Sequence, residues 1–363
     1  MSQALITVDK IDEKDSSSVE KLEFRKIPLS PVREFYGEFL VGENRGIIKL
    51  DQADNVSAYR LDITTYGGII CLRKINHVRY LNKYFESINR ALLEDGIYIG
   101  CAETNYQLRK RLKEKYSWYI YYPFFLVHFI VKRILPRWAV SKRFYFYITR
   151  GKNRVISLTE LLGRLVSCGF EILEYKSIDG LTYYAVKRTV KPAYEMDPTY
   201  GPVVGLKRVG KDGKIIRMYK FRTMHPYAEF IQGYVYERSG LDRGDKIIND
   251  FRVTAWGAFL RKYWIDELPM LINLLKGDIK LVGVRPLSKH KLSLYSETLR
   301  ELRNRNKPGL IPPYYADMPQ DFDGLQESEY NYLINYSKNP IKTDVKYFFR
   351  AVYNILIKRA RSG

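Results

Sequence analysis

Apolar runs alternate with amphipathic stretches over the first half of the chain. "GGIICL" (67–72) is a short apolar run typical of a buried strand, Tyr80–Leu93 carries apolar residues at helical spacing, and "GIYIGCAET" (96–104) is a second apolar run. A strand, helix, strand order predicts a parallel sheet. Residues 1 to about 60 contain short apolar segments separated by Gly and Asp, which indicate small strands and turns.

The pattern continues with another helix and two strands. Ser157 and Glu160 have the spacing of a capping box, Gly169 supplies a helix stop, and strands are expected at 170–175 and 182–188. Residues 60–188 resemble the C-terminal half of a class I methyltransferase, on the segments "RALLEDGIYI" (90–99) and "ELLGRLVSCGFEIL" (160–173). The resemblance implies a Rossmann-like fold.

Methyltransferases of this class hold S-adenosylmethionine at a Gly-rich turn between the first strand and a helix. In "GENRGIIKLD" (42–51) glycines are present, but no helical pattern follows them. We therefore favour a degenerate, cofactor-free scaffold over an active methyltransferase with an accessory domain.

A change of composition divides the chain. The chain has 363 residues, whereas a domain with a single hydrophobic core rarely grows beyond about 250–300 residues. The segment "KRTVKPAYEMDPTYGP" (187–202) brings prolines and polar residues between two patterned regions. We expect an α/β chain with a Rossmann-like domain at 1–188, a linker at 189–198 and a second α/β domain at 199–363.

A β-hairpin is predicted at the start of the second domain. Apolar residues at 203–209 and 215–219 flank "GKDG" (210–213), which has the composition of a tight turn. Lys220 and Arg222 follow on the extended segment and should project from one face, which suits a diphosphate. Taken alone, the same pattern is also typical of a solvated basic strand.

Two neighbouring carboxylates follow in "WGAFLRKYWIDELPMLINLLKG" (256–277). Since Pro269 is tolerated near a helix start but not inside a helix, the segment predicts a helix, a tight break and another helix. Asp266 and Glu267 lie at this junction, where the helix dipole is expected to favour their anionic forms as nucleophile or metal ligand. A strand at 277–286 should then end near Arg285.

Five strings of the second half resemble the bacterial sugar transferases, the monotopic phosphoglycosyl transferases, over about residues 199–355. They are "YKFRTM" (219–224), "DFRVTAWGAFLR" (250–261), "DELPM" (266–270), "NLLKGD" (273–278) and "VGVRP" (282–286). The family members transfer a sugar 1-phosphate from a UDP-sugar to a polyprenyl (undecaprenyl) phosphate and so initiate assembly of surface polysaccharides or glycoconjugates.

The resemblance implies a role for individual residues. Asp266 would be the nucleophile that forms an aspartyl-phosphosugar, and Glu267 would handle the proton of the acceptor. Both carboxylates would hold Mg²⁺. The residues expected to bind substrate are Lys220, Arg222, Arg252, Arg285 and Asp344.

Departures from the family pattern leave an alternative open. Met270 and Val284 replace the usual Gln and Pro, "KPGLIPPYYADMP" (307–319) lacks the family's "PGxTG", and no apolar re-entrant helix precedes Gly201. A catalytically inactive scaffold or lipid-binding relative therefore remains possible. The sequence leaves the sugar, the lipid and the oligomeric state open.

Charge points to an anionic partner. The net charge is +21, and basic residues flank the longest uncharged run, Tyr116–Val131, which falls short of the roughly 20 residues that span a bilayer. The segment 116–135 is expected to contact the membrane in place of the missing re-entrant helix, with a break at Pro123. Its alternative is a buried helix of the Rossmann-like domain. The expected contact residues are Trp118, Pro123, Phe124, Phe125 and Phe129.

Other partners are disfavoured. No nucleic-acid recognition module is visible, and the three cysteines lack the spacing of a zinc site or a disulfide framework. The N-terminus lacks the apolar core of a signal peptide. We therefore expect a protein at the cytoplasmic face of the bacterial inner membrane, with no nucleic-acid partner.

Overall fold

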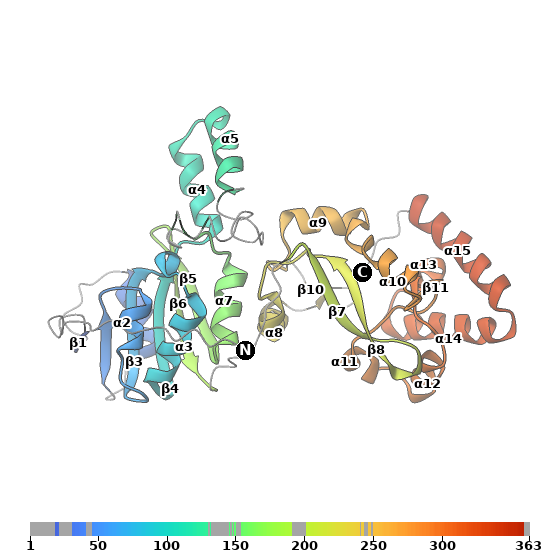
Figure 1. Cartoon of the computed structure of the whole chain (residues 1–363), viewed down its shortest axis with the longest axis horizontal. Coiled ribbons are helices and arrows are strands. Elements are labelled where there is room, and N and C mark those ends of the chain that lie inside the picture. The colour runs from blue at the N-terminus through green and yellow to red at the C-terminus, as the bar shows by residue number, and fades with distance from the viewer. Residues whose placement is uncertain are drawn as a thin grey trace. The chain divides into compact units, whose positions relative to one another are not determined.

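The computed structural model describes residues 19–21, 31–40, 46–129, 131, 145, 147, 149, 154–190, 201–239, 241–242, 246–247 and 250–358. The chain forms two compact units. Unit 1 contains Met1–Pro198 and Glu229–Ile231, and unit 2 contains Thr199–Ala228 and Gln232–Gly363. Residues 191–198 of the expected linker lie outside the described residues. Both units combine helices and strands, so the α/β class is confirmed (Figure 1).

Unit 1 is built on a six-stranded sheet with the order β1-β2-β3-β4-β6-β5. β2, β3 and β4 run parallel, which confirms the predicted parallel pairing, while β6 runs antiparallel to both of its neighbours. The parallel strands place unit 1 in the α/β class. The strands are β1 (Val19–Lys21), β2 (Ile47–Leu50), β3 (Tyr66–Lys74), β4 (Leu92–Ala102), β5 (Phe170–Ile178) and β6 (Leu181–Arg188).

Helices cover both faces of this sheet. Odd-numbered residues of β4, such as Ile97, pack in a cluster with Phe35 and Tyr36 of α1, whereas Tyr98 meets Tyr84 and Phe85 of α3 on the opposite face. The helices are α1 (Pro31–Leu40), α2 (Asn55–Tyr59), α3 (Leu81–Ala91), α4 (Asn105–Lys115), α5 (Trp118–Phe129) and α7 (Leu158–Ser167), with a 3-10 turn η2 (Ile75–His77).

The predicted start and stop of α7 are present, whereas the prediction for the start of unit 1 fails. Ser157 Oγ accepts a hydrogen bond from the Glu160 amide at 3.1 Å, and Gly169 adopts a left-handed φ of 88° directly after α7. The expectation of only small strands and turns before residue 60 is wrong, because α1 and α2 are helices. The apolar residues Val32, Phe35, Tyr36 and Phe39 that pack α1 on the sheet recur at helical spacing.

The helices α4 and α5 form a hairpin that projects from the sheet of unit 1 (Figure 1). α5 runs continuously from Trp118 to Phe129 with Pro123 inside it, so the expected break at Pro123 is wrong. Residues 130 and 132–135 of the apolar segment lie outside the described residues. Of the helices that are described, none is both long and apolar enough to cross a membrane.

Unit 2 begins with the predicted hairpin of β7 (Val203–Val209) and β8 (Ile215–Phe221), joined by η5 (Lys211–Gly213). The predicted helix, break and helix are also confirmed as α9 (Ala255–Lys262), η7 (Ile265–Glu267) and α10 (Met270–Leu275). The turn η6 (Ala228–Ile231) follows, and its residues Glu229–Ile231 belong to unit 1. The remaining elements of unit 2 are α8 (Gln232–Ser239), β9 (Leu241–Asp242), β10 (Lys246–Ile247), β11 (Lys280–Val282), α11 (Lys289–Ser293), α12 (Glu297–Asn304), β12 (Gly309–Ile311), α13 (Tyr314–Asp317), α14 (Phe322–Lys338) and α15 (Pro340–Leu356).

Two apolar clusters hold unit 2 together. Met218 of β8 packs on Met270 of α10 and on Ile279, which attaches the hairpin to the segment that follows the two carboxylates. A larger cluster surrounds the parallel pair of β11 and β12 and includes Tyr332 of α14 and Tyr347 of α15. Arg285 lies in the loop after β11, since that strand already ends at Val282.

Candidate active site

Asp266 and Glu267 lie in the 3-10 turn η7 between α9 and α10. The turn starts at Trp264, whose left-handed φ of 63° is uncommon for a residue with a side chain. The indole ring of Trp264 packs 4.4 Å from the ring of Tyr315, which helps to hold this backbone in place. The turn leaves Asp266 only 9% exposed.

Two cations converge on Glu267. Lys220 Nζ donates to Glu267 Oε1 at 2.5 Å, and a guanidinium nitrogen of Arg285 lies 3.9 Å from the same oxygen. Arg285 also donates to the phenol oxygen of Tyr314 at 2.8 Å. Residues from β8, η7, the loop after β11 and α13 therefore meet at one position.

The pKa of Asp266 is raised above its ordinary value. Burial is the main cause, and the neighbouring Glu267 adds to it, while Lys220 and Arg261 oppose it. The expectation that the helix dipole would favour the anionic form is therefore wrong for Asp266, because desolvation dominates. Burial likewise lowers the pKa of Lys220, and Glu267 partly offsets this effect.

A buried amide places Lys220 opposite Glu267. Asn273 of α10 accepts from the Tyr219 amide at 2.9 Å and donates to the Arg217 carbonyl at 2.8 Å, so it bonds the backbone of β8 on both sides of Met218. Its side chain also donates to Asp278 at 2.9 Å. The string "NLLKGD" (273–278) thus has a physical basis in the attachment of the hairpin to α10.

A close backbone contact fixes α9. The Thr223 carbonyl accepts from the Thr254 amide at 2.9 Å, and Thr254 caps α9 by accepting from the Gly257 amide at 2.8 Å. A Cβ at Gly257 would lie 1.9 Å from the Thr223 carbonyl oxygen. Only glycine allows this approach, which joins the segment after β8 to the helix that leads into η7.

Three of the predicted substrate-binding residues lie in other contacts. Arg222 Nε donates to the Gly201 carbonyl at 3.0 Å. Arg252 is buried and forms a two-pronged ion pair with Asp250 at 2.8 Å for each bond, which lowers the pKa of Asp250 despite its burial. Asp344 accepts from Lys280 at 3.1 Å and from Tyr332 at 2.6 Å. None of the contacts found within the described residues joins Asp344 to Asp266 or Glu267.

Sequence reasoning did not assign two residues that the structure brings to the site. Arg261 donates to Thr223 Oγ1 at 3.0 Å and lies close enough to Asp266 and Asp250 for charge interactions with both. Tyr314 is the hydrogen-bond acceptor of Arg285. Arg261 ends the string "DFRVTAWGAFLR", which is a usable signal, whereas Tyr314 lies in the segment that departs from the family pattern.

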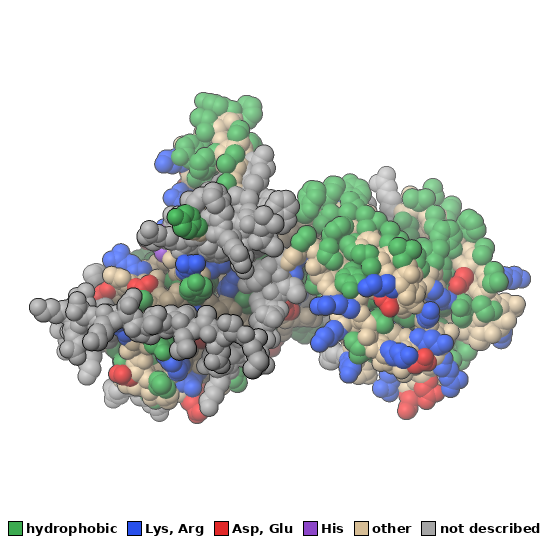
Figure 2. Space-filling view, viewed as in Figure 1, with side chains coloured by type: hydrophobic (Ala, Val, Ile, Leu, Met, Phe, Trp, Pro, Cys, Tyr) green, Lys and Arg blue, Asp and Glu red, His purple; other side chains and the backbone are tan. Residues whose placement is uncertain are grey.

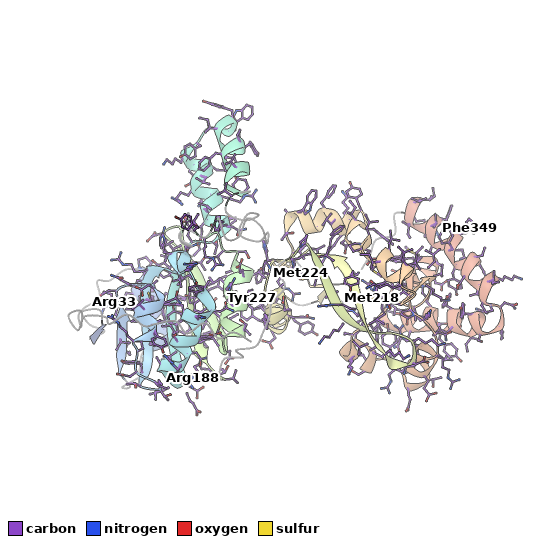
Figure 3. All side chains as sticks on the ribbon, viewed as in Figure 1. Arg33, Arg188, Met218, Met224, Tyr227 and Phe349 are labelled. Atoms are coloured by element: carbon purple, nitrogen blue, oxygen red, sulfur yellow. The ribbon has the colours of Figure 1, made fainter. Side chains whose placement is uncertain are left out.

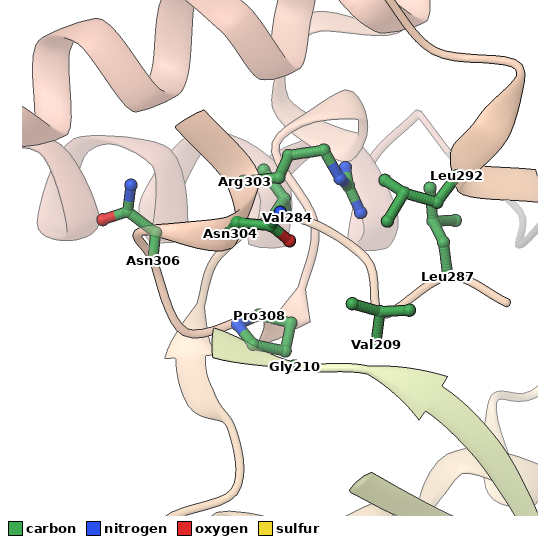
Figure 4. A pocket seen from close by; sticks show the side chains of 9 residues that line it. All are labelled: Val209, Gly210, Val284, Leu287, Leu292, Arg303, Asn304, Asn306 and Pro308. Carbon is green, nitrogen blue, oxygen red and sulfur yellow. The ribbon is translucent and has the colours of Figure 1, made fainter. Parts of the chain in front are cut away.

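The ion pair of Arg303 with Glu329 supports the backbone of Arg285. Arg303 pairs with Glu329, which is fully buried, and also donates to the Arg285 carbonyl. Arg303 lines a small pocket with Val209 and Gly210 at the turn end of the hairpin (Figure 4). Lys220 pairs with Val204 at the opposite end of the hairpin, so this pocket is separate from the carboxylates.

Exposed apolar side chains form a surface of unit 2 that we call the apolar face. Figure 2 shows apolar side chains gathered over α9 and α15. Trp256 is 66% exposed and Phe349, labelled in Figure 3, is 67% exposed. The face comprises Trp256, Phe259 and Tyr263 of α9, Leu271 and Leu275 of α10, and Ile341, Val345, Phe349, Tyr353 and Leu356 of α15.

The expected membrane-contact residues of unit 1 lie on α5. Trp118, Pro123 and Phe124 are exposed and Phe125 is half-buried, whereas the side chain of Phe129 is outside the described set. α5 is therefore not a buried core helix, and that alternative is removed for the described part of the segment.

Among the described residues of unit 1, the connection that follows β2 has no Gly-rich turn. Asp51–Asp54 connect β2 to α2 without a glycine, and Asp54 caps α2 by accepting from the Ser57 amide at 2.7 Å. At the ends of β3 and β4, Asn76 donates to the carbonyls of Glu103 and Arg154, each at 2.8 Å. The segment 41–45 of the glycine-containing stretch lies outside the described residues.

Comparisons with known proteins identify the second half of the chain. The family described as bacterial sugar transferase matches residues 189–358. An undecaprenyl-phosphate galactose phosphotransferase of Salmonella typhimurium is 35% identical over 36% of this chain, and the galactosyl transferase CpsE of Streptococcus agalactiae is 30% identical over 60%. The matches span 28% and 45% of the lengths of these two relatives.

A likeness among solved structures is weaker. An S-adenosylmethionine-dependent methyltransferase from Mesorhizobium loti has a TM-score of 0.22 at 10% identity, over 35% of this chain and 64% of that protein. The α/β class of unit 1 rests instead on its own strand order. The family match, the relatives and the motif strings around Asp266 agree on the second half: residues 189–358 belong to the bacterial sugar transferase family.

Proposed function

We propose that the chain transfers a sugar 1-phosphate from a UDP-sugar to a polyprenyl phosphate, through a covalent intermediate on Asp266. The observation that carries this proposal is the pair of carboxylates in η7, with the buried Asp266 beside a Glu267 held by Lys220 and Arg285. Phosphoryl transfer requires cations at the phosphate oxygens and a positioned nucleophile. Family membership supplies the class of reaction.

The proposed reaction has two displacement steps. A carboxylate oxygen of Asp266 attacks the sugar-bearing phosphorus of the UDP-sugar, and the bond from that phosphorus to the UMP oxygen breaks. A phosphate oxygen of the acceptor lipid then attacks the same phosphorus, and the aspartyl ester bond breaks to restore the Asp266 carboxylate. This sequence is a ping-pong mechanism, because UMP leaves before the acceptor reacts.

The surrounding cations have separate tasks in this scheme. Lys220 and Arg285 would neutralise phosphate oxygens near Glu267, and Arg261 would stabilise the anionic form of Asp266. Glu267 would take up the proton of the acceptor phosphate. Arg252, which is paired with Asp250, would act mainly by fixing the loop before α9.

The residues fit a magnesium ion whose ligands come partly from the protein and partly from the substrate. Among the described residues no three His, Cys, Asp or Glu side chains come together as a metal site. Mg²⁺ commonly binds one or two carboxylates together with substrate phosphates, and Asp266 and Glu267 would provide the protein share. Bound there, it would neutralise charge on the diphosphate. Chelation by EDTA is expected to stop UMP release.

The acceptor lipid requires contact with a membrane. We assign this contact in unit 2 to the apolar face, since α9 and α10 directly flank η7 and would hold Asp266 near the headgroup level. Trp and Tyr are enriched where proteins meet the membrane interface. In this scheme the chain works at the cytoplasmic face of the bacterial inner membrane.

The test is release of UMP by the purified full-length chain from a panel of UDP-sugars, with polyprenyl phosphate and Mg²⁺. UDP-galactose comes first, because both relatives named above carry galactose or galactosyl in their names. We expect release with at least one donor and none with Asp266→Asn. If the parent chain releases no UMP from any donor, it is instead an inactive scaffold or lipid-binding relative.

A further inference from the structure

The hairpin of α4 and α5 carries an apolar surface of a kind that a soluble domain does not need. α5 has no Asp, Glu, Lys or Arg, and at about 100° per residue its exposed side chains cover most of the helix circumference except the sector that faces α4. Trp118 is 75% exposed, whereas Tyr121 faces α4 and is only 2% exposed. The exposed residues are Trp118, Tyr119, Ile120, Tyr122, Phe124 and Val127. A helix that is apolar on all sides is normally buried.

The base of the hairpin is anchored firmly in the sheet. Thr104 and Gln107 form a capping box at the start of α4, and the Gln107 side chain donates to Ser177 at 3.0 Å and to Thr182 at 2.8 Å. The amide of Asn105 also donates to the Ile156 carbonyl at 2.9 Å. The hairpin is thus fixed at its base, and its apolar helix α5 lies away from the core of unit 1.

α4 lines the apolar helix with cations. The guanidinium of Arg109 on α4 lies 4.7 Å from the ring centre of Phe125, and the ammonium of Lys113 lies 5.8 Å from the ring centre of Tyr121. Basic residues dominate α4, with Glu114 as its acidic residue. The hairpin therefore combines an aromatic surface with a positive one.

We propose that the α4–α5 hairpin is a membrane anchor of unit 1 that enters one leaflet of an anionic bilayer. A helix of 12 residues is about 18 Å long, short of the roughly 30 Å of a hydrocarbon core. Cations near the surface each contribute about 1 kcal/mol against anionic lipid. A second copy of the chain fits less well, because pairing two hairpins would bring their positive helices together.

This anchor adds to the proposed transferase and is independent of its activity. It belongs to unit 1, whereas the apolar face belongs to unit 2, so each surface can be tested separately. A folded chain that inserts its hairpin but releases no UMP would contradict the proposed function and leave the anchor in place.

A single fluorescent label tests the proposal in the full-length chain. The chain has three cysteines, and Cys71, Cys101 and Cys168 are all buried, so a cysteine introduced by Tyr122→Cys can be labelled selectively with an environment-sensitive dye. The matched control is Tyr59→Cys, another exposed tyrosine of unit 1. Vesicles of phosphatidylglycerol and phosphatidylcholine should shift the emission of the dye at position 122 to the blue and leave the dye at position 59 unchanged.

Two results would overturn the anchor. The first is an unchanged signal at position 122 while the labelled chain co-sediments with the vesicles, since the membrane contact would then lie elsewhere. The second is a blue shift that depends on protein concentration without vesicles, since a second copy would then cover the hairpin. A complementary variant combines Trp118→Ser, Tyr122→Ser and Val127→Ser with a labelled cysteine introduced by Tyr119→Cys. This variant should show no vesicle-induced blue shift of the dye, while its circular dichroism spectrum stays unchanged.

Discussion

Desolvation of Asp266 has consequences for both stability and activity. Burial raises the pKa of its carboxyl group, so the folded state binds the proton more tightly than the unfolded state does. The stability that this provides is present at low pH and is lost as the pH rises through the folded pKa. At neutral pH the ionised Asp266 therefore destabilises the fold, and catalysis should decline in acid below a pKa higher than that of an ordinary aspartate.

We predict that Asp266→Asn raises the melting temperature at neutral pH and that this gain disappears below about pH 4, where an unfolded aspartate is protonated. Thermal melts of parent and variant at both pH values measure the effect. Asp344→Asn is the control, because Asp344 is held by Lys280 and its replacement should lower the melting temperature. A lower melting temperature for Asp266→Asn at neutral pH would contradict the explanation by desolvation.

Tyr314 is a positioning residue for Arg285. Tyr314→Phe removes the acceptor that lies 2.8 Å from the guanidinium, and the loss of a hydrogen bond to a charged group costs about 1.5–3 kcal/mol. We expect kcat/KM to fall about tenfold or more, chiefly through a higher KM for the UDP-sugar. Tyr330→Phe, at an exposed position of α14, is the control. Equal steady-state constants for Tyr314→Phe and the parent would exclude this role.

At the scale of elements, the attachment of α9 to the segment after β8 determines where η7 lies. Gly257→Ala places a Cβ against the Thr223 carbonyl, and overpacking of this kind costs about 1–3 kcal/mol. We expect a lower free energy of unfolding together with weaker activity. Gly233→Ala in α8, where a Cβ meets nothing, is the matched control: it should leave activity unchanged and should not lower the free energy of unfolding. Normal stability of Gly257→Ala would show that α9 can shift without cost.

Local pattern predicted most elements but could not tell which face of a helix meets solvent. The hairpin around Asp212 and the break before Pro269 follow from turn and proline chemistry, which acts over a few residues. Trp256, Phe259 and Tyr263 have the spacing of core residues, yet they lie exposed on α9. Periodicity indicates that a helix has an apolar side, but whether this side packs in the core or lies exposed depends on the tertiary structure.

At the scale of the whole molecule, the second half could be assigned from its sequence because the motif strings keep their order. The geometry of the site could not be assigned in the same way. The contacts of Asp344 with Lys280 and of Tyr314 with Arg285 required the structure, since an ion pair or a hydrogen bond between distant segments leaves no local pattern. The likeness of unit 1 to a methyltransferase stays a prediction, as does its lack of a cofactor.

The central claim is that Asp266 carries the sugar phosphate as a covalent ester. The most direct measurement is mass spectrometry of the intact chain and its peptides after incubation with the UDP-sugar that supports UMP release, in the absence of acceptor lipid. We predict a mass increase of one sugar phosphate on the peptide that contains Asp266, which disappears on addition of polyprenyl phosphate and is absent in Asp266→Asn. Turnover of Asp266→Asn near the parent rate, or an adduct on another residue, would contradict the account.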